Sequence, residues 1–148
     1  MDITFRPVTR DNFSDVIGLK VAPSQEDFVA PNVYSLAEAS LEPSWTPLAI
    51  YADERIVGFA LFGRDDQTGR WWIMRYMIDA AHQGKGYGTA ALPMLIDLMV
   101  ARHGCQEIFL GYDLGNDVAE RLYSRVGFVP TGEEAEEIVA RLDLTGRG

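Results

Sequence analysis

The sequence predicts an α+β fold, in which one mixed sheet of about six to seven strands is flanked by about four helices. The first half contains strand-like segments and short helical patterns, residues 86–127 have the pattern of helix, strand and helix, and a pair of strand-like segments follows. The 148 residues predict a single domain spanning residues 1–148 with a buried core. The mean hydropathy of -0.05 agrees with a globular protein.

The N-terminal region is predicted to combine one strand with short helices. Residues 3–7 alternate apolar and polar side chains, as in a strand, and a proline ends them. Asp11 is placed to cap a helix that reaches Lys20. Residues 24–27 have a capping-box pattern and predict a further helical turn, and residues 35–42 predict another short helix.

A three-stranded meander is expected next. Residues 47–52 and 55–64 form a predicted hairpin, with Asp53 and Glu54 at its turn. A second turn, which contains glycine, then leads into a third predicted strand at residues 70–78.

The second half begins with a long predicted helix. Apolar residues recur at i, i+3 and i+4 over residues 86–103. Pro93 lies near the second turn of this helix, where we expect an early kink. Residues 107–112 are a predicted strand, and their consecutive apolar side chains indicate burial on both faces.

A second helix and a hairpin are expected to complete the domain. Asp117 and Glu120 form a capping box, and Gly127 is placed at the C′ position of the same helix. Residues 128–134 and 136–144 then form a predicted hairpin.

The stretch from Gln83 to Thr89, Gln-Gly-Lys-Gly-Tyr-Gly-Thr, is the strongest functional signal. It follows a predicted strand and opens a helix, so its backbone N–H groups and the positive helix end can bind an anion. A Walker-type loop requires Gly-Lys-Ser/Thr after four intervening residues, and the sequence contains none. The spacing also differs from the Gly-x-Gly-x-x-Gly of dinucleotide-binding folds.

This loop and a downstream segment resemble the two core motifs of the GNAT superfamily of acetyl-CoA-dependent N-acetyltransferases. The motifs are Gln-x-x-Gly-x-Gly, which begins at Gln83, and Asn116-x-x-Ala119-x-x-Leu122-Tyr123-x-x-x-Gly127-Phe128. The resemblance covers most of the chain. It implies a GNAT-like central sheet, acetyl-CoA as co-substrate, and direct transfer of the acetyl group to an amine.

The resemblance also implies where acetyl-CoA binds. The backbone N–H groups of residues 83–88 would hold the pyrophosphate, with the Thr89 hydroxyl as a further donor, and a side chain at Gly86 or Gly88 would obstruct its approach. The pantetheine arm would pair with the backbone of residues 77–79, in a gap opened by a bulge in that strand. The implied cofactor-binding residues are Met77, Ile78, Gln83, Gly84, Lys85, Gly86, Tyr87, Gly88, Thr89 and Asn116.

Tyr123 matches the general-acid position of the family. A phenol held by a helix near the sulfur can protonate the leaving thiolate, whereas the pattern around Tyr123 alone would indicate a packing residue. Asn116 would contact the cofactor arm or serve as an ordinary helix cap. No general base is assigned, and the candidate carboxylates are Glu26, Asp27, Asp79 and Asp113.

Composition disfavours several classes of protein. The net charge of -9 would repel nucleic acid, and no run reaches the roughly 18 apolar residues of a membrane span. The N-terminus lacks signal-peptide character, and the single Cys105 allows no internal disulfide, so we expect a cytoplasmic protein. Cys105 is expected to be a core residue rather than a nucleophile. His82 and His103 lack the spacing of a metal site, so no metal is predicted.

The acceptor amine is expected to be selected by residues 11–42, which have an acidic bias. Residues 25–39 resemble the corresponding segment of bacterial spermine/spermidine acetyltransferases. Carboxylates along a groove can pair with the separated ammonium groups of a polyamine, and aromatic rings can cover its methylenes. A solvated acidic face explains the same pattern. The substrate-binding candidates are Glu26, Asp27, Tyr34 and Glu38.

The sequence leaves two alternatives open. The acceptor of a GNAT enzyme can also be an aminoglycoside, an amino acid or a protein N-terminus. The same fold can instead bind acyl-CoA as a regulatory module without turnover. Homodimers are frequent in the family, although the sequence identifies no interface.

Overall fold

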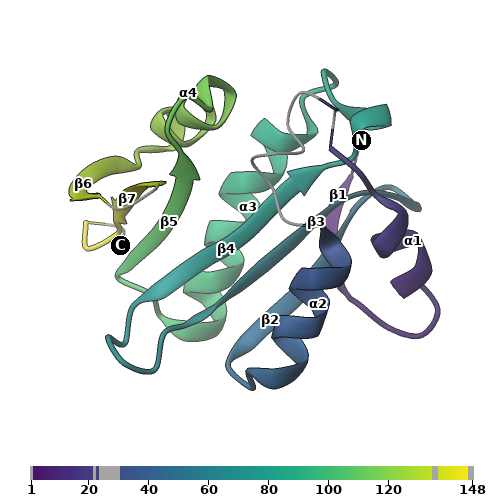
Figure 1. Cartoon of the computed structure of the whole chain (residues 1–148), viewed down its shortest axis with the longest axis horizontal. Helices are drawn as coiled ribbons and strands as arrows, with labels where there is room; N and C mark the ends of the chain where they lie inside the picture. The colour runs from purple at the N-terminus through teal and green to yellow at the C-terminus, as the bar shows by residue number, and fades with distance from the viewer. Residues whose placement is uncertain (1, 22, 24–30, 135–136, 147–148) are drawn as a thin grey trace.

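The computed structural model describes residues 2–21, 23, 31–134 and 137–146. The strands in these ranges form one mixed sheet in the order β1-β2-β3-β4-β5-β7-β6 (Figure 1). Only β4 and β5 run parallel to each other within this sheet, and the other neighbouring strands are antiparallel. The strands are β1 (Ile3–Pro7), β2 (Trp45–Ala52), β3 (Arg55–Arg64), β4 (Trp71–Ile78), β5 (Glu107–Asp113), β6 (Val129–Glu134) and β7 (Glu137–Asp143).

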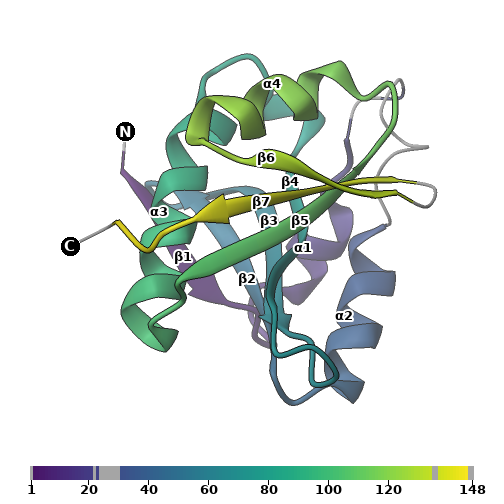
Figure 2. The same cartoon turned by 90° about the vertical axis from the view of Figure 1, so that its left-hand side faces the viewer.

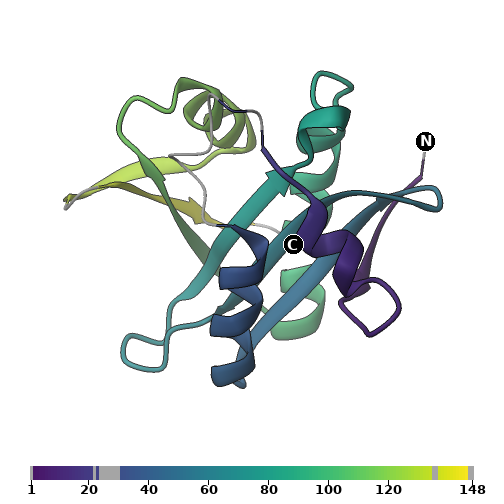
Figure 3. The ribbon, with the colours of Figure 1, turned by 45° about the vertical axis from the view of Figure 1, so that its right-hand side comes forward.

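Helices cover both faces of the sheet. Figure 3 shows α1 (Phe13–Gly18) and α2 (Asn32–Leu41) in front of β2, β3 and β4, with α3 (Tyr87–His103) behind them. The last helix, α4 (Asp117–Val126), lies beside β5, β6 and β7 (Figure 2). The sequence prediction of an α+β fold with a central mixed sheet is therefore confirmed.

The two faces of the sheet carry separate hydrophobic cores. Buried Leu92 and Leu95 of α3 pack with Phe62 and Leu110 of the sheet on one face. On the other face, Val16 of α1 packs into a second cluster, whose further members are Ala49, Tyr51, Phe59, Leu61 and Met77. Burial of this apolar surface on both sides is the main force that holds the helices on the sheet.

The N-terminal helices differ in detail from the prediction. α1 begins at Phe13 after Asn12, so Asp11 is not its N-cap. The Asn12 side chain instead accepts a hydrogen bond from the Thr9 N–H at 2.8 Å and donates one to the Pro7 carbonyl at 3.0 Å. α2 begins at Asn32, earlier than expected. The predicted helical turn at residues 24–27 lies outside the described residues.

The meander of β2, β3 and β4 forms as predicted, and one glycine allows two strands to approach closely. A Cβ atom on Gly58 of β3 would lie only 2.4 Å from the backbone oxygen of Met77 on β4. A backbone atom within a sheet cannot move away cheaply. Gly58 therefore fixes the position of the β4 segment around Met77.

The remaining elements follow the prediction closely. Pro93 lies inside α3, and Gly104 ends this helix in the left-handed conformation. β6 and β7 pair as expected, while the turn between them, residues 135–136, is outside the described part. Within the described ranges, none of the helices is long and apolar enough to cross a membrane.

Candidate active site

The site begins where the two parallel strands of the sheet separate. β4 and β5 pair only through Trp72 with Phe109 and Ile73 with Leu110. Beyond these pairs the strands diverge, as Figure 1 shows. The edge of β4 that faces β5 therefore pairs with no described strand over residues 74–78. The Met74 and Ile78 carbonyls accept hydrogen bonds from the Arg75 and Gln83 side chains, and the other backbone groups of this edge can bind an extended ligand.

A bulge lies at the start of this divergence. Leu61 of β3 pairs with Arg75, whereas the next residue, Phe62, pairs with Ile73, so Met74 is an extra residue in β4. A bulge increases local twist and turns a strand away from its neighbour. The bulge expected from the family resemblance is thus present.

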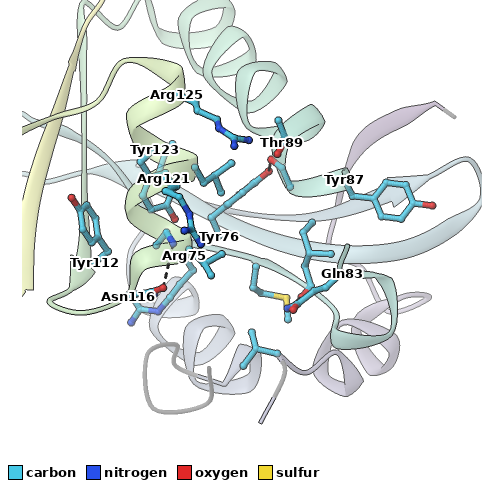
Figure 4. A pocket seen from close by; sticks show the side chains of 18 of the residues that line it. Arg75, Tyr76, Gln83, Tyr87, Thr89, Tyr112, Asn116, Arg121, Tyr123 and Arg125 are labelled. Carbon is cyan, nitrogen blue, oxygen red and sulfur yellow. Dashed lines mark hydrogen bonds between the residues drawn. The ribbon is translucent and has the colours of Figure 1, made fainter. Parts of the chain in front are cut away.

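A pocket of about 670 Å³ fills the gap between the diverging strands. It is lined by the end of β4, the glycine-rich loop, the first turn of α3, the end of β5 and one face of α4 (Figure 4). This volume is within the range of about 300–1,000 Å³ that is typical of small-molecule sites.

The glycine-rich loop has a backbone conformation that favours glycine. Gly84 and Gly86 have φ angles of 80° and 85°, in the left-handed region. A Cβ at either position would meet no heavy atom within 4 Å, so conformation and not crowding explains these glycines. Gly86 is the N-cap of α3, and the free N–H groups of the following turn make this helix end a site for an anion.

Two hydrogen bonds hold this loop against β4. The Tyr76 hydroxyl donates to the Gly88 carbonyl at 2.6 Å, and Gln83 Nε2 donates to the Ile78 carbonyl at 2.9 Å. Because both acceptors are backbone atoms, the bonds fix the path of the loop. The N-terminal end of α3 and the edge of β4 that faces β5 are thereby held in a fixed relation.

Most of the predicted cofactor-binding residues line this one pocket, but Lys85 is exposed and does not line it. Asn116 lines the pocket and also caps α4, because its Oδ1 accepts a hydrogen bond from the Ala119 N–H at 3.2 Å. The predicted capping box at Asp117 is wrong by one residue. The predicted residues that line the pocket are Met77, Ile78, Gln83, Gly84, Gly86, Tyr87, Gly88, Thr89 and Asn116.

Tyr123 projects from α4 into the same pocket. Its ring packs between Tyr112, at 5.9 Å between centroids, and Phe128, at 6.0 Å. Its hydroxyl forms no hydrogen bond with any described residue. Burial raises the pKa of Tyr123 to about 12. The phenol therefore stays protonated at neutral pH and is available as a proton donor.

A second partly buried tyrosine, Tyr76, also lines the pocket. Burial, with a smaller contribution from Tyr123, raises the pKa of Tyr76. Its hydroxyl is already committed to the Gly88 carbonyl. Of the two phenols, only Tyr123 has a proton that no described protein group accepts.

Two arginines in the pocket were missed by the sequence analysis. Arg121 and Arg125 lie one turn apart on α4, on either side of Tyr123, and both line the pocket. Neither pairs with a described carboxylate. In Figure 4 the Arg125 guanidinium extends toward the side of the pocket where Thr89 lies. Their i, i+4 spacing places both on one face of the predicted helix, which was the available signal.

The predicted acceptor-binding residues are dispersed. Glu26 and Asp27 lie outside the described residues. Tyr34 is exposed on α2 and does not line the pocket. Glu38 forms an ion pair with Arg75 at 3.1 Å, and Arg75 lines the pocket. Glu38 thus reaches the edge of the site through a partner that the sequence did not reveal.

The described candidate bases, Asp79 and Asp113, do not line the pocket. Asp79 instead accepts a hydrogen bond from the Lys20 N–H at 2.8 Å. Glu137 at the start of β7 is the one carboxylate among the described pocket-lining residues, and the sequence analysis missed it. Its signal was indirect: Gly111 interrupts an otherwise apolar strand.

Cys105 is a core residue, as predicted. Its thiol is buried, and its Sγ lies 3.6 Å from the Met99 carbonyl, to which it donates. Burial raises its pKa, which disfavours the reactive thiolate. Within the described ranges, no group of three or more His, Cys, Asp or Glu side chains is arranged to hold a metal ion.

The chain is similar to a known family and to known proteins. The model of the acetyltransferase (GNAT) family matches residues 14–128. The spermine/spermidine N(1)-acetyltransferase of Bacillus subtilis (strain 168) is 33% identical over 139 residues, which cover 90% of this chain and 91% of that protein.

Solved structures share the fold at lower sequence identity. An acetyltransferase from Thermus thermophilus superposes with a TM-score of 0.78 at 17% identity, over 97% of this chain and 98% of the other. The spermidine N-acetyltransferase from Vibrio cholerae, in complex with CoA and spermine, gives 0.73 at 18% identity, over 94% and 92% of the two chains. These structures show the shared fold, and the family match over residues 14–128 with the 33% identity to the B. subtilis protein shows that the chain belongs to the acetyltransferase (GNAT) family.

Proposed function

We propose that this protein transfers the acetyl group of acetyl-CoA to a primary amine of a polyamine such as spermine or spermidine. The observation that supports the proposal most strongly is one shared pocket. It joins a helix end suited to an anion, a strand edge that pairs with no described strand and a half-buried, protonated tyrosine. The similarity to a bacterial enzyme named for spermine and spermidine supports the choice of acceptor.

The described residues fit acetyl-CoA. The free N–H groups after Gly86 suit the pyrophosphate, and Arg121 and Arg125 suit a second phosphate because they line the pocket without protein partners among the described residues. The unpaired edge of β4 offers backbone groups to the pantetheine amides. CoA supplies the acetyl group in activated form, as a thioester.

Tyr123 acts in this proposal as the general acid. The acceptor nitrogen attacks the acetyl carbonyl carbon, so a C–N bond forms while the C–S bond breaks. The Tyr123 hydroxyl donates its proton to the leaving sulfur. The Tyr123 phenol lies in the pocket and is protonated at neutral pH, so it has a proton to donate there.

A polyamine acceptor agrees with the charge of the protein. The net charge of -9 creates a field that attracts polycations. We propose Glu26, Asp27, Tyr34 and Glu38 as acceptor contacts. The V. cholerae neighbour, which contains spermine, shares the fold. We further propose that the enzyme works in the cytoplasm as a single 1–148 domain, and a homodimer stays a prediction.

The test of this function is acetyl-CoA-dependent thiol release with a panel of amines. The panel contains spermine, spermidine, a short diamine, an aminoglycoside and a peptide. We expect turnover on the polyamines that weakens as ammonium groups are removed. Turnover on another amine alone would refute the polyamine assignment, and saturable CoA binding without turnover on any amine would favour a regulatory module.

A further inference from the structure

We propose that Glu137 is the general base of this enzyme, the group that takes the proton from the attacking ammonium. The inference rests on the proposed transfer to an amine, but it does not depend on which amine is the acceptor. Nothing in the motifs of the sequence pointed to Glu137. The proposal comes from the position of its carboxylate in the pocket.

The Glu137 carboxylate lies in the space that a side chain at position 111 would fill. A Cβ on Gly111 of β5 would be 2.6 Å from Glu137 Oε1, 2.8 Å from Cδ and 3.2 Å from Oε2. Glu137 pairs in register with Asp113, so its side chain crosses diagonally toward Gly111. The glycine in this buried strand therefore lets the carboxylate enter the gap between β4 and β5.

The orientation of β5 places this carboxylate opposite the helices that bear the cofactor site. Ile108, Leu110 and Tyr112 pack into the core formed with α3. Side chains alternate along a strand, so position 111 faces the other side of the sheet, the side of α1 and α2. An acceptor that enters from that side would meet Glu137 at the gap, with Tyr123 across it.

Charge distribution distinguishes Glu137 from every other described group around the gap. Arg75, Arg121 and Arg125 also line the pocket, and Glu137 is the one acid among its described lining residues. The charged groups that face this side of the gap are Asp113, paired with Glu137 in register, and Arg75, which is bound to Glu38. Glu137 itself forms no ion pair or side-chain hydrogen bond with a described residue, so it is free to bind an ammonium group.

A base is needed because the acceptor is charged. With an ordinary amine pKa of about 10.4, roughly one molecule in 2,500 is neutral at pH 7. Glu137 accepts one proton of the ammonium, directly or through one water, and the neutral nitrogen then forms the C–N bond. As the C–S bond breaks, the Tyr123 hydroxyl gives its proton to the sulfur. The resulting phenolate then takes the second proton from the nitrogen. Glu137 returns its proton to solvent.

Two variants separate the position of the carboxylate from its charge. Glu137→Gln removes the charge and keeps the shape of the side chain. Gly111→Ala keeps the charge, but the new Cβ displaces the carboxylate, and alanine is allowed because Gly111 does not have a positive φ angle. Asp66→Asn, at an exposed turn between β3 and β4, is the control for loss of one negative charge. Circular dichroism and urea unfolding confirm that each variant folds.

The measurement is kcat from pH 7 to pH 10 on whichever amine the wild-type enzyme acetylates best. For Glu137→Gln we expect a loss of about 10²–10⁴-fold at pH 7 that shrinks toward pH 10, where solution supplies the neutral amine. Gly111→Ala should show a smaller loss with the same pH dependence, and Asp66→Asn should match the wild type.

Three outcomes would overturn the assignment. These are wild-type turnover by Glu137→Gln, a loss that is equal at every pH, and a rise in KM at unchanged kcat. Failure of the polyamine proposal is a separate result, because it appears with the wild-type enzyme alone as turnover on a different amine.

Discussion

The hydroxyl of Tyr76 donates a hydrogen bond to the carbonyl oxygen of Gly88 across 2.6 Å. Tyr76 belongs to β4, and Gly88 lies in the first turn of α3. The bond therefore connects the strand that offers its edge to an extended ligand with the helix end that suits a phosphate. It makes the two halves of the proposed acetyl-CoA site one rigid unit.

Tyr76→Phe tests this connection. The loss of one hydrogen bond should cost about 1 kcal/mol of stability and raise the KM for acetyl-CoA several-fold, while kcat stays near the wild-type value. Tyr51→Phe is the matched control, because its hydroxyl bonds Asn12 far from this loop. A fall in kcat of about 10²–10⁴-fold, the size expected for loss of a general acid, would mean that Tyr76 takes part in proton transfer and that the positioning role is wrong.

The two arginines of α4 predict a salt-sensitive contribution to donor binding. Arg125→Gln should raise the KM for acetyl-CoA by about tenfold, the magnitude of one charge-assisted hydrogen bond, with a smaller effect on kcat. The effect should diminish as ionic strength increases. Arg102→Gln, on the exposed last turn of α3, is the control. An unchanged KM at low salt would remove Arg125 from the donor site.

Replacement of Gly58 is expected to lower the stability of the fold through Met77, a residue that lines the pocket. Gly58→Ala should lower the free energy of unfolding by about 1–3 kcal/mol, because its Cβ would lie 2.4 Å from the Met77 carbonyl oxygen. Gly18→Ala should be neutral or slightly stabilising, since its Cβ meets no atom within 4 Å. Urea unfolding measures both. Equal stability of the two variants would show that β3 and β4 can separate without cost.

The raised pKa of Tyr123 predicts how kcat depends on pH under alkaline conditions. Because burial raises the pKa of Tyr123 to about 12, the protonated form persists to higher pH than for an exposed tyrosine. Loss of kcat through ionisation of Tyr123 should therefore be absent at pH 10. A decline in kcat with an apparent pKa near 10 or below, accompanied by unchanged stability of the fold, would show that the phenol is not desolvated during turnover.

Local patterns in the sequence predicted most of the fold and most of the residues that line the pocket around the glycine-rich loop. The glycine-rich turn before a helix and the β2–β3 hairpin depend on residues that are neighbours in the sequence. Local sequence patterns can therefore predict both features. Asn116 and Asp117 are both good capping residues, and only the backbone path selects Asn116. Sequence position alone could not decide between them.

The residues proposed to act on the acceptor amine could not be predicted from local sequence patterns. The Glu38–Arg75 ion pair joins a helix and a strand that are far apart in the sequence. The Glu137 carboxylate enters the pocket because a glycine on the neighbouring strand leaves space. Both depend on sheet register and packing, which periodicity does not specify.

The most direct test of the account is the kcat of Tyr123→Phe on the amine that the wild-type enzyme acetylates best, with the affinity for CoA measured in parallel. We predict a fall of about 10²–10⁴-fold in kcat with CoA affinity unchanged, because the phenylalanine ring still packs between Tyr112 and Phe128 but cannot protonate the sulfur. Wild-type turnover by this variant would contradict the assignment of Tyr123 as the general acid.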